Sequence, residues 1–253
     1  MFNPKTDRIR MLAKLFPELI IELNRIFSTS TNIYIDWQNV IHWQNKLGFH
    51  IHFVRLKQFL DSFDSIRAVN IYTGTSESSK ESIKQISELR SSGYTLSTKA
   101  VKLIRISIDT SNTSTNSTVI LSNFIKKNFI SIMDSASIEH LNGRLTKLNR
   151  EGVLYIEERK CNFDVEISRD MQRDFENGIT KNYILWSTDS DFADLIIQIE
   201  KGGGKVYIFA MSGCISFELN QTTVTIFDIR KIREFICWPK EISKEIKDII
   251  NRL

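Results

Sequence analysis

The sequence predicts a doubly wound α/β fold, in which a mostly parallel sheet lies between two layers of helices. Two observations support this prediction. Short apolar runs rich in β-branched and aromatic residues alternate along the chain with segments of helical periodicity, as in strands joined by crossover helices. The runs are also mostly apolar, as expected for buried strands of a parallel sheet that helices cover on both faces.

Five segments have the length and composition of buried strands, namely residues 32–35, 67–72, 182–186, 205–210 and 223–227. The first ends abruptly at Asp36, the second is closed by Thr73-Gly74, and the third is followed by the polar turn 187–190. Right-handed crossovers place the loops after parallel strands along one edge of the sheet, and ligands bind at that carboxyl edge. We therefore expect the residues after the first and third strands to lie close together.

Four segments carry apolar residues at the spacing of one helix face, namely residues 54–63, 78–90, 163–176 and 192–201. The third repeats its apolar residues at intervals of four, and Asn177-Gly178 behind it supplies a C-cap. The fourth ends at three consecutive glycines, 202–204, just before the next strand. Helices therefore fill the intervals between strands, as this fold class requires.

The main domain is expected over residues 31–236, with additions at both ends. Residues 1–30 form a helical N-terminal extension with an amphipathic pattern. Residues 237–253 form a C-terminal extension whose last helix is expected over 240–252. Both additions are interpreted as helices that pack against the main domain.

The rhythm of strands and helices breaks at about 107–153, which we interpret as an insertion into the main domain. It opens with a polar tract over 109–118, without apolar residues, which is expected to be a flexible loop. Two helices are expected behind it, around 119–129 and 137–148. The insertion is a candidate site for docking a protein partner.

Composition limits the classes of function. The formal charge of +4 and the pI of about 8.9 are too mild to diagnose a nucleic-acid binder, although they would not repel phosphates. The three cysteines have no CxxC spacing, so they suggest neither a zinc cluster nor a disulfide framework. No apolar run reaches 18 residues, which excludes a predicted membrane span, and the charged N-terminus excludes a secretory signal. We expect a soluble protein of the reducing cytoplasm.

Four aspartates stand where a metal centre would form. Asp36 directly follows the first strand, Asp189 and Asp191 follow the third, and Asp164 opens a helix. Converging carboxylates repel one another, and a divalent cation removes that conflict. Because the donors are oxygens alone, without His or Cys, they select Mg²⁺ or Mn²⁺ over zinc.

Each acid also has a structural interpretation. Asp36 and Asp189 fit the N-cap of a following helix, and Asp164 lies in a first helical turn, where the helix dipole stabilises a carboxylate. Asp170 falls inside the apolar stripe of its helix, so it needs a partner, either as a support for the site or as a structural hydrogen-bond acceptor. No single acid decides between metal binding and capping; only their joint placement favours a metal site.

Taken in order, three motifs resemble the NYN domain, in particular its LabA-like group within the PIN-like nuclease superfamily. They are Asp36-Trp-Gln-Asn39, the segment from Lys160 to Asp170, and Ser187-Thr-Asp-Ser-Asp-Phe192. The resemblance covers roughly residues 31–106 and 154–230. It implies a PIN-like, Rossmann-like three-layer α/β/α fold and a metal-dependent nuclease, and it makes RNA the expected substrate.

The resemblance also implies roles for individual residues. Asp36, Asp164, Asp189 and Asp191 become the metal ligands and the catalytic residues. The residues expected to support the site or to contact substrate are Asn39 (orienting Asp36 or holding a bridging water), Ser187 and Thr188 (touching a phosphate or an acid), Asp170 (supporting), Lys160 (steadying a phosphate, or a solvated lysine) and Trp37 (stacking a base, or packing into the sheet edge). The family usually has glycine where this chain has Trp37, Thr188 and Ser190, which bears on rate and substrate more than on metal binding.

Other metal-binding α/β folds do not fit the residues. A haloacid-dehalogenase-like phosphatase needs an aspartate at position 38, which is Gln38, and no Walker-type or dinucleotide glycine motif is present. The alternative to a metal-dependent endoribonuclease is a LabA-like RNA-binding or regulatory protein whose acidic centre is weak or inactive. Whether the chain forms a homo-oligomer stays open.

Overall fold

The computed structural model describes residues 1–76 and 78–252, apart from the side chains of residues 45 and 250–252. The chain divides into two compact units. Unit 1 comprises Met1–Ala100 with Cys161–Leu253, and unit 2 comprises Val101–Lys160. Residue 253, the last of the predicted C-terminal extension, lies outside the described residues.

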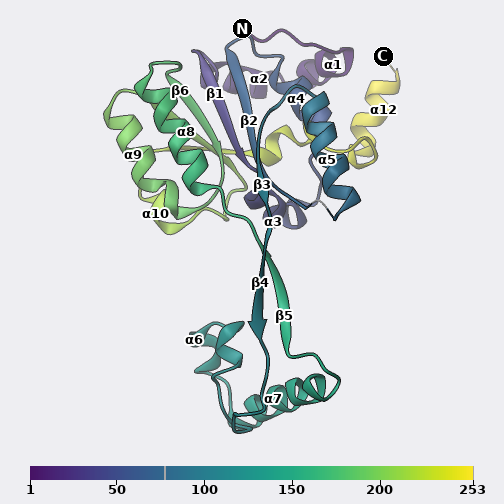
Figure 1. The fold of residues 1–253 in the computed structure, drawn as a ribbon. Coiled ribbons are helices and arrows are strands. Elements are labelled where there is room, and N and C mark those ends of the chain that lie inside the picture. The colour runs from purple at the N-terminus through teal and green to yellow at the C-terminus, as the bar shows by residue number, and fades with distance from the viewer. Residues whose placement is uncertain (77, 253) are drawn as a thin grey trace. The chain divides into compact units, whose positions relative to one another are not determined.

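Six parallel strands form the sheet of unit 1, which confirms the predicted doubly wound α/β fold (Figure 1). Their order is β3-β2-β1-β6-β7-β8. The strands are β1 (Thr31–Asp36), β2 (Ile66–Thr75), β3 (Thr95–Ala100), β6 (Asn182–Trp186), β7 (Lys205–Ala210) and β8 (Thr225–Asp228). Because the chain winds outward from β1 in one direction and from β6 in the other, the topological switch point lies between these two strands.

The two central strands are buried along their whole length, as the sequence predicted. Strand β3 was not predicted, since its residues TLSTKA form no apolar run. It pairs only with β2 and is half exposed, and an edge strand of this kind needs no apolar sequence. Because β3 lies at the edge of the sheet, its sequence has no apolar run from which the strand could be predicted.

Helices cover both faces of the sheet in unit 1. Figure 1 shows α8 and α9 on one side of the strands and α4 and α5 on the other. The longer helices are α1 (Asp7–Leu15), α2 (Pro17–Ile26), α3 (Trp37–Leu47), α4 (Phe53–Leu60), α5 (Lys80–Ser91), α8 (Asp164–Glu176), α9 (Ala193–Lys201) and α12 (Lys244–Arg252). The short ones are η2 (Ser190–Phe192), α10 (Phe217–Asn220), η3 (Ile229–Ile232), α11 (Arg233–Ile236) and η4 (Pro239–Glu241).

The N-terminal residues are two helices and not the single amphipathic helix expected. Pro17 occupies the first turn of α2, where its missing N–H removes no bond, so the chain turns between Leu15 and Pro17. Ile9 and Leu23 from these helices belong to the same buried cluster as the strands. The N-terminal region is therefore part of the core of unit 1.

Unit 2 is wider than the predicted insertion at 107–153, because an antiparallel pair of strands encloses it. These strands are β4 (Lys102–Ser107) and β5 (Tyr155–Lys160), joined in register from Lys102 opposite Lys160 to Ser107 opposite Tyr155. Neither strand is buried, so their mixed apolar and charged sequences gave no strand signal.

The rest of unit 2 is helical and loop-like. The second expected helix is α7 (Ser135–Arg150), whereas the first, around 119–129, is reduced to η1 (Leu121–Asn123) and α6 (Lys127–Ile130). The polar tract is a loop held to α7, since Asn142 donates to two of its carbonyls at 2.7 Å. No helix in the described part of the chain is long and apolar enough to cross a membrane.

Candidate metal centre at the carboxyl edge of the sheet

The four predicted aspartates follow the ends of elements that meet at the switch point. Asp36 is the last residue of β1, and Asp189 and Asp191 lie in the turn after β6. Strands β1 and β6 are direct neighbours, with Ile35 opposite Trp186. Asp164 is the first residue of α8, which packs against β1 and η2.

Three of these side chains form a compact group. Asp164, Asp189 and Asp191 each offer a carboxylate oxygen, and the three oxygens lie within 4.8 Å of one another. Asp191 is exposed, while Asp164 and Asp189 are partly covered. The group can therefore be reached from solvent, and its separations suit ligands that converge on one small cation.

Asp36 lies deeper and outside that group of three. It is only 5% exposed, and its carboxylate accepts the backbone N–H of Asn39 at 3.2 Å, which makes it the N-cap of α3. Its pKa is raised to about 6, mainly by burial; the charges of Asp164 and Asp189 contribute to this rise, and the Asn39 hydrogen bond opposes it. The capping interpretation of Asp36 is confirmed, and its role as a metal ligand stays a prediction.

Asp164 experiences the same electrostatic conflict. Burial raises its pKa, and the charges of Asp189 and Asp191 add to that shift, while a hydrogen bond from Asn162 opposes it. Among the residues that the structure describes, no lysine, arginine or histidine forms an ion pair with any of the four acids. Within the described part of the chain, the cluster is therefore not neutralised by any direct ion pair.

Asn39 holds the turn after β6 against α3. Its side-chain oxygen accepts from the backbone N–H of Thr188 at 3.1 Å, from the Thr188 hydroxyl at 3.0 Å and from Trp43 Nε1 at 2.7 Å. The expected orienting role toward Asp36 comes from its backbone N–H and not from its side chain. Thr188 is accordingly a support that joins the two segments.

The turn itself is shaped by two side chains. Ser187 is fully buried and its hydroxyl accepts the backbone N–H of Asp189 at 3.3 Å. One oxygen of Asp189 accepts the N–H of Asp191 at 3.2 Å, which caps η2. Since a carboxylate has two oxygens, this cap leaves acceptor capacity for a ligand.

The two residues predicted to contact substrate, Trp37 and Lys160, have different environments in the structure. Trp37 is 4% exposed and packs against Phe53, with ring centroids 4.5 Å apart, so the base-stacking prediction is wrong and the packing alternative holds. Lys160 is an exposed residue at the end of β5 and belongs to unit 2. Its predicted phosphate contact stays a prediction.

A cation that the sequence analysis did not single out lies near the acids in unit 1. Lys99, in β3, pairs with Glu166 at 2.8 Å and lies over the ring of Phe163 at 4.5 Å. Its charge lowers the pKa of Asp164 but does not outweigh burial and the neighbouring aspartates. No sequence signal marked it, because it comes from the unpredicted edge strand.

Asp170 belongs to a second, separate polar cluster further along α8. It accepts the hydroxyl of Tyr72 at 2.9 Å and pairs with Arg173 at 3.1 Å. One turn on, Asp174 accepts the hydroxyl of Tyr34 at 2.6 Å and the side-chain amide of Asn32 at 2.9 Å. These groups border a cavity of about 210 Å³. Asp170 is thus a structural acceptor, one of the two alternatives expected.

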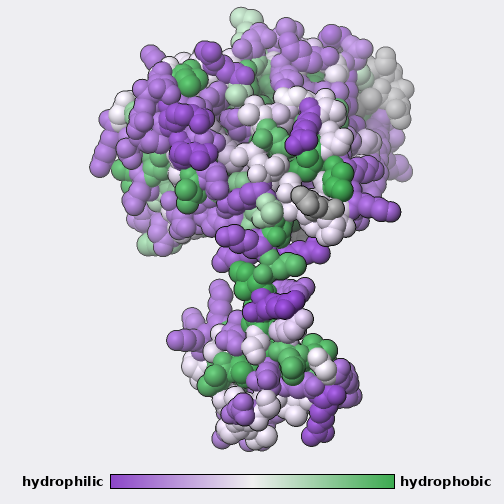
Figure 2. Space-filling view, in the orientation of Figure 1, coloured by the Kyte–Doolittle hydropathy of each residue, from purple (hydrophilic) through white to green (hydrophobic). Residues whose placement is uncertain are grey.

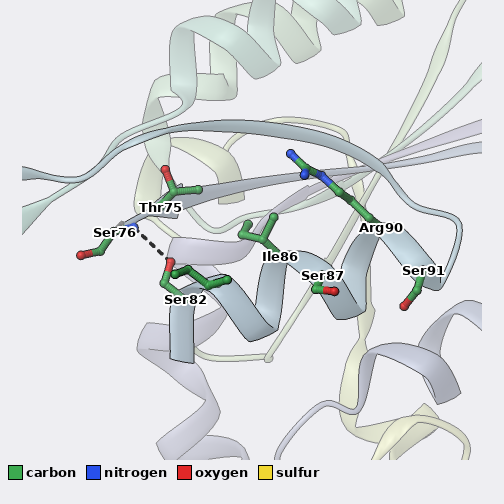
Figure 3. Close-up of a pocket in the computed structure, with 8 residues that line it drawn as sticks. Thr75, Ser76, Ser82, Ile86, Ser87, Arg90 and Ser91 are labelled. Atoms are coloured by element: carbon green, nitrogen blue, oxygen red, sulfur yellow. Dashed lines mark hydrogen bonds between the residues drawn. The ribbon is translucent and has the colours of Figure 1, made fainter. Parts of the chain in front are cut away.

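A groove of about 470 Å³ runs beside α5, between that helix and the end of β2 (Figure 3). Hydroxyl groups, Arg90 and the apolar side chains of Ile83 and Ile86 line it, and the backbone N–H of Ser76 donates to Ser82 Oγ at 3.0 Å. None of the predicted site residues lines this groove. This groove is therefore separate from the group of aspartates.

No protein-family model matches this chain, and no curated protein matches it. Among solved structures, the chain is similar to a protein of unknown function from Vibrio parahaemolyticus. The two share 14% sequence identity with a TM-score of 0.49, over 79% of this chain and 93% of the other. A likeness at this level assigns no role to any residue of this chain.

Proposed function

We propose that this chain is a metal-dependent nuclease, an endoribonuclease that hydrolyses RNA phosphodiester bonds at Asp36, Asp164, Asp189 and Asp191. The observation that carries the proposal is the group of three carboxylate oxygens within 4.8 Å at the carboxyl edge, beside a fourth buried acid. The switch point of a doubly wound sheet is where such folds bind ligands. The resemblance of the three motifs to the NYN domain supports RNA as the substrate.

The chemistry of the donors fits a hard divalent cation. All four donors are carboxylates, which suit Mg²⁺ or Mn²⁺, and the acids have no cationic partner among the described residues. The raised pKa values of Asp36 and Asp164 show that burial and mutual repulsion disfavour their charged forms. When bound, such an ion polarises a phosphate oxygen and lowers the pKa of a water molecule.

The side chains of this chain provide the positions. Asp36 and Asp164 approach from β1 and α8, and Asp189 with Asp191 approach from the turn after β6. Asn39 and Thr188 join that turn to α3 through two hydrogen bonds. The three cysteines without CxxC spacing are consistent with a reducing compartment, and we propose the cytoplasm as the place of action.

The deciding experiment is a cleavage assay with labelled mixed-sequence single-stranded RNA in Mn²⁺, Mg²⁺ or EDTA. Asp189→Asn is expected to reduce metal-dependent cleavage by at least about 100-fold, since even partners of metal ligands lower activity by 10- to 100-fold when removed. Asp194→Asn is the matched control, because Asp194 lies on the exposed side of α9 and outside the cluster.

Cleavage that survives in the Asp36→Asn/Asp189→Asn double variant would reject this site. RNA binding without cleavage in any metal would instead favour the regulatory, RNA-binding alternative. A single-stranded DNA of the same sequence tests the preference for RNA, because only a contact with the 2′-hydroxyl can separate the two substrates at one site.

A further inference from the structure

Unit 2 holds most of the excess positive charge of the chain. Its 60 residues carry nine lysines and arginines against six aspartates and glutamates, a net charge of +3 out of +4. All nine basic residues are exposed. Among the described residues, only Arg105 of these nine has an ion-pair partner, Glu157 at 3.3 Å. Unpaired surface cations of this number favour an anionic partner.

Two exposed aromatic rings flank a pair of these lysines. Phe124 is 42% exposed and Phe129 is 58% exposed, and Lys126 and Lys127 lie between them in the sequence and are exposed too. The segment has a defined shape, since the backbone N–H of Phe129 donates to the carbonyl of Lys126 at 2.9 Å. Rings and ammonium groups are therefore offered together on a short, ordered stretch.

These rings are exposed although the same stretch of chain contributes other side chains to the small core of unit 2. The same stretch turns Leu121 and Ile130 inward, where they meet Ile138 of α7 in a small buried cluster. Aliphatic residues thus fill the core while the two larger, flat side chains stay outside. Figure 2 shows apolar side chains mixed with hydrophilic ones over the surface of this unit.

Helix α7 adds a basic face. His140, Arg144 and Lys147 follow one another at intervals of four and three, so they lie on one side of the helix, and all three are exposed. Neither Arg144 nor Lys147 pairs with an acid among the described residues. This face adds donors for phosphate contacts within the same unit.

We propose that unit 2 is a docking module for single-stranded nucleic acid. Bases stack on Phe124 and Phe129, and Lys126 and Lys127 pair with the phosphates between them, as in the stacking platforms of single-strand binders. Arg144 and Lys147 take further phosphates. The identity of the strand as the substrate rests on the proposed function, but the binding itself does not require the acids of unit 1.

The same observations disfavour a protein partner on this surface. The centres of protein interfaces are depleted in lysine, because burying an unpaired ammonium is unfavourable, and here two lysines lie between the exposed rings. Nucleic acid instead provides a phosphate for each lysine and a flat base for each ring. A protein partner is therefore an alternative outcome of the test.

The test measures binding without cleavage, in the full-length Asp189→Asn protein with EDTA present. Fluorescence anisotropy follows a labelled 20-nucleotide single strand of RNA, and a DNA strand of the same sequence in parallel. Phe124→Ala/Phe129→Ala is expected to weaken binding by about tenfold or more. Lys126→Glu/Lys127→Glu should weaken it further at low salt, and the slope of log K against log salt should fall by at least about 1.4, or 0.7 for each lysine.

The matched control is Lys181→Glu/Lys201→Glu, which makes the same change in charge in unit 1, at the start of β6 and the end of α9. It should leave affinity within about twofold of the parent protein, and thermal unfolding should show that all variants are folded. Because the replaced side chains are exposed, no loss of fold is expected.

Unchanged affinity in both unit 2 variants would overturn the proposal. So would an equal loss in the control, since that would show only a response to net charge. A change of oligomeric state by light scattering, with RNA affinity intact, would identify a protein interface and overturn it as well. The outcome is separable from the proposed function, because cleavage can fail while this binding persists, and the reverse.

Discussion

The two ends of helix α8 hold acids in opposite circumstances. At its start, Asp164 lies beside three other aspartates with no cationic partner among the described residues, and burial raises its pKa. In its second half, Asp170 has Arg173 and the Tyr72 hydroxyl, and Asp174 has the Tyr34 hydroxyl and an amide. The protein itself therefore supplies the partners of Asp170 and of Asp174.

The difference separates acids whose partners belong to the fold from acids that we propose as metal ligands. Burial and the neighbouring carboxylates raise the pKa of Tyr34 and of Tyr72, so both phenols stay protonated and keep donating. The second cluster is thereby complete. The first is incomplete, and it is the one at the switch point. The lack of a cationic partner, and not the charge alone, is what supports the proposed metal site.

The largest effect on stability is expected from breaking the complete cluster. Asp174→Ala removes the acceptor of two buried donors, from Tyr34 and Asn32, and should lower the free energy of unfolding by about 3 kcal/mol. Urea denaturation measures it. Glu176→Ala, an exposed position at the end of the same helix, is the control and should change stability by less than about 0.5 kcal/mol. Similar losses in both variants would contradict the distinction.

The opposite sign is expected at Asp36. With a pKa of about 6 in the folded protein against an ordinary 3.8, its carboxyl holds a proton that the unfolded chain releases between those values. The free energy of unfolding of the metal-free protein should therefore fall as pH rises from 4 to 6, by about 2 kcal/mol.

Asp36→Asn should remove that contribution and raise the stability of the metal-free protein at pH 7, because the amide oxygen can still accept from Asn39. Thermal unfolding in EDTA at pH 4.5 and pH 7 measures both effects. Asp170→Asn supplies the contrast, since it weakens pairing with Arg173 and should destabilise. A variant of Asp36 less stable than the parent at pH 7 would refute the account.

A smaller effect should follow from adding metal. Mg²⁺ at about ten times its dissociation constant should stabilise the folded protein by about 1.4 kcal/mol, because it binds the folded state alone. The shift in melting temperature should vanish in Asp189→Asn and survive in Asp170→Asn. Equal shifts in these two variants would place the ion elsewhere.

The smallest effect on the free energy of unfolding is expected in unit 2, from removing an exposed aromatic ring. A buried ring of unit 1 serves as the comparison. Phe129→Ala should change the free energy of unfolding by less than about 0.5 kcal/mol, since the ring is 58% exposed. Phe163→Ala in unit 1, where the ring is 1% exposed, should lower it by about 3 kcal/mol or more. Chemical denaturation of both variants decides whether the exposed ring contributes to folding.

Most of the sheet could be predicted because its strands are buried on both faces and show it in their composition. The strands that escaped were β3, an edge strand, and β4 with β5, which are exposed. At these edge or exposed positions, packing does not require apolar residues. Buried strands show in their composition, whereas strands that are exposed or only half buried do not.

For the site, topology explains why the order of motifs was informative. Asp36, Asp189 and Asp191 come from neighbouring parallel strands, so their positions after each strand implied proximity. The partners could not be foreseen. The side-chain oxygen of Asn39 accepts from Thr188, and the ring of Trp37 packs against Phe53. These contacts depend on how α3 packs in the folded protein, so residue spacing in the sequence does not predict them.

The pairing of Lys102 with Lys160 has a consequence for how this protein can change over generations. Directly opposed residues of antiparallel strands have Cα atoms about 5 Å apart, so the chain leaves and re-enters unit 1 at almost one point. A short turn could bridge that gap. The gene segment for residues 101–160 can thus be lost, exchanged or acquired as a cassette while the aspartates of unit 1 keep their places in the reading frame.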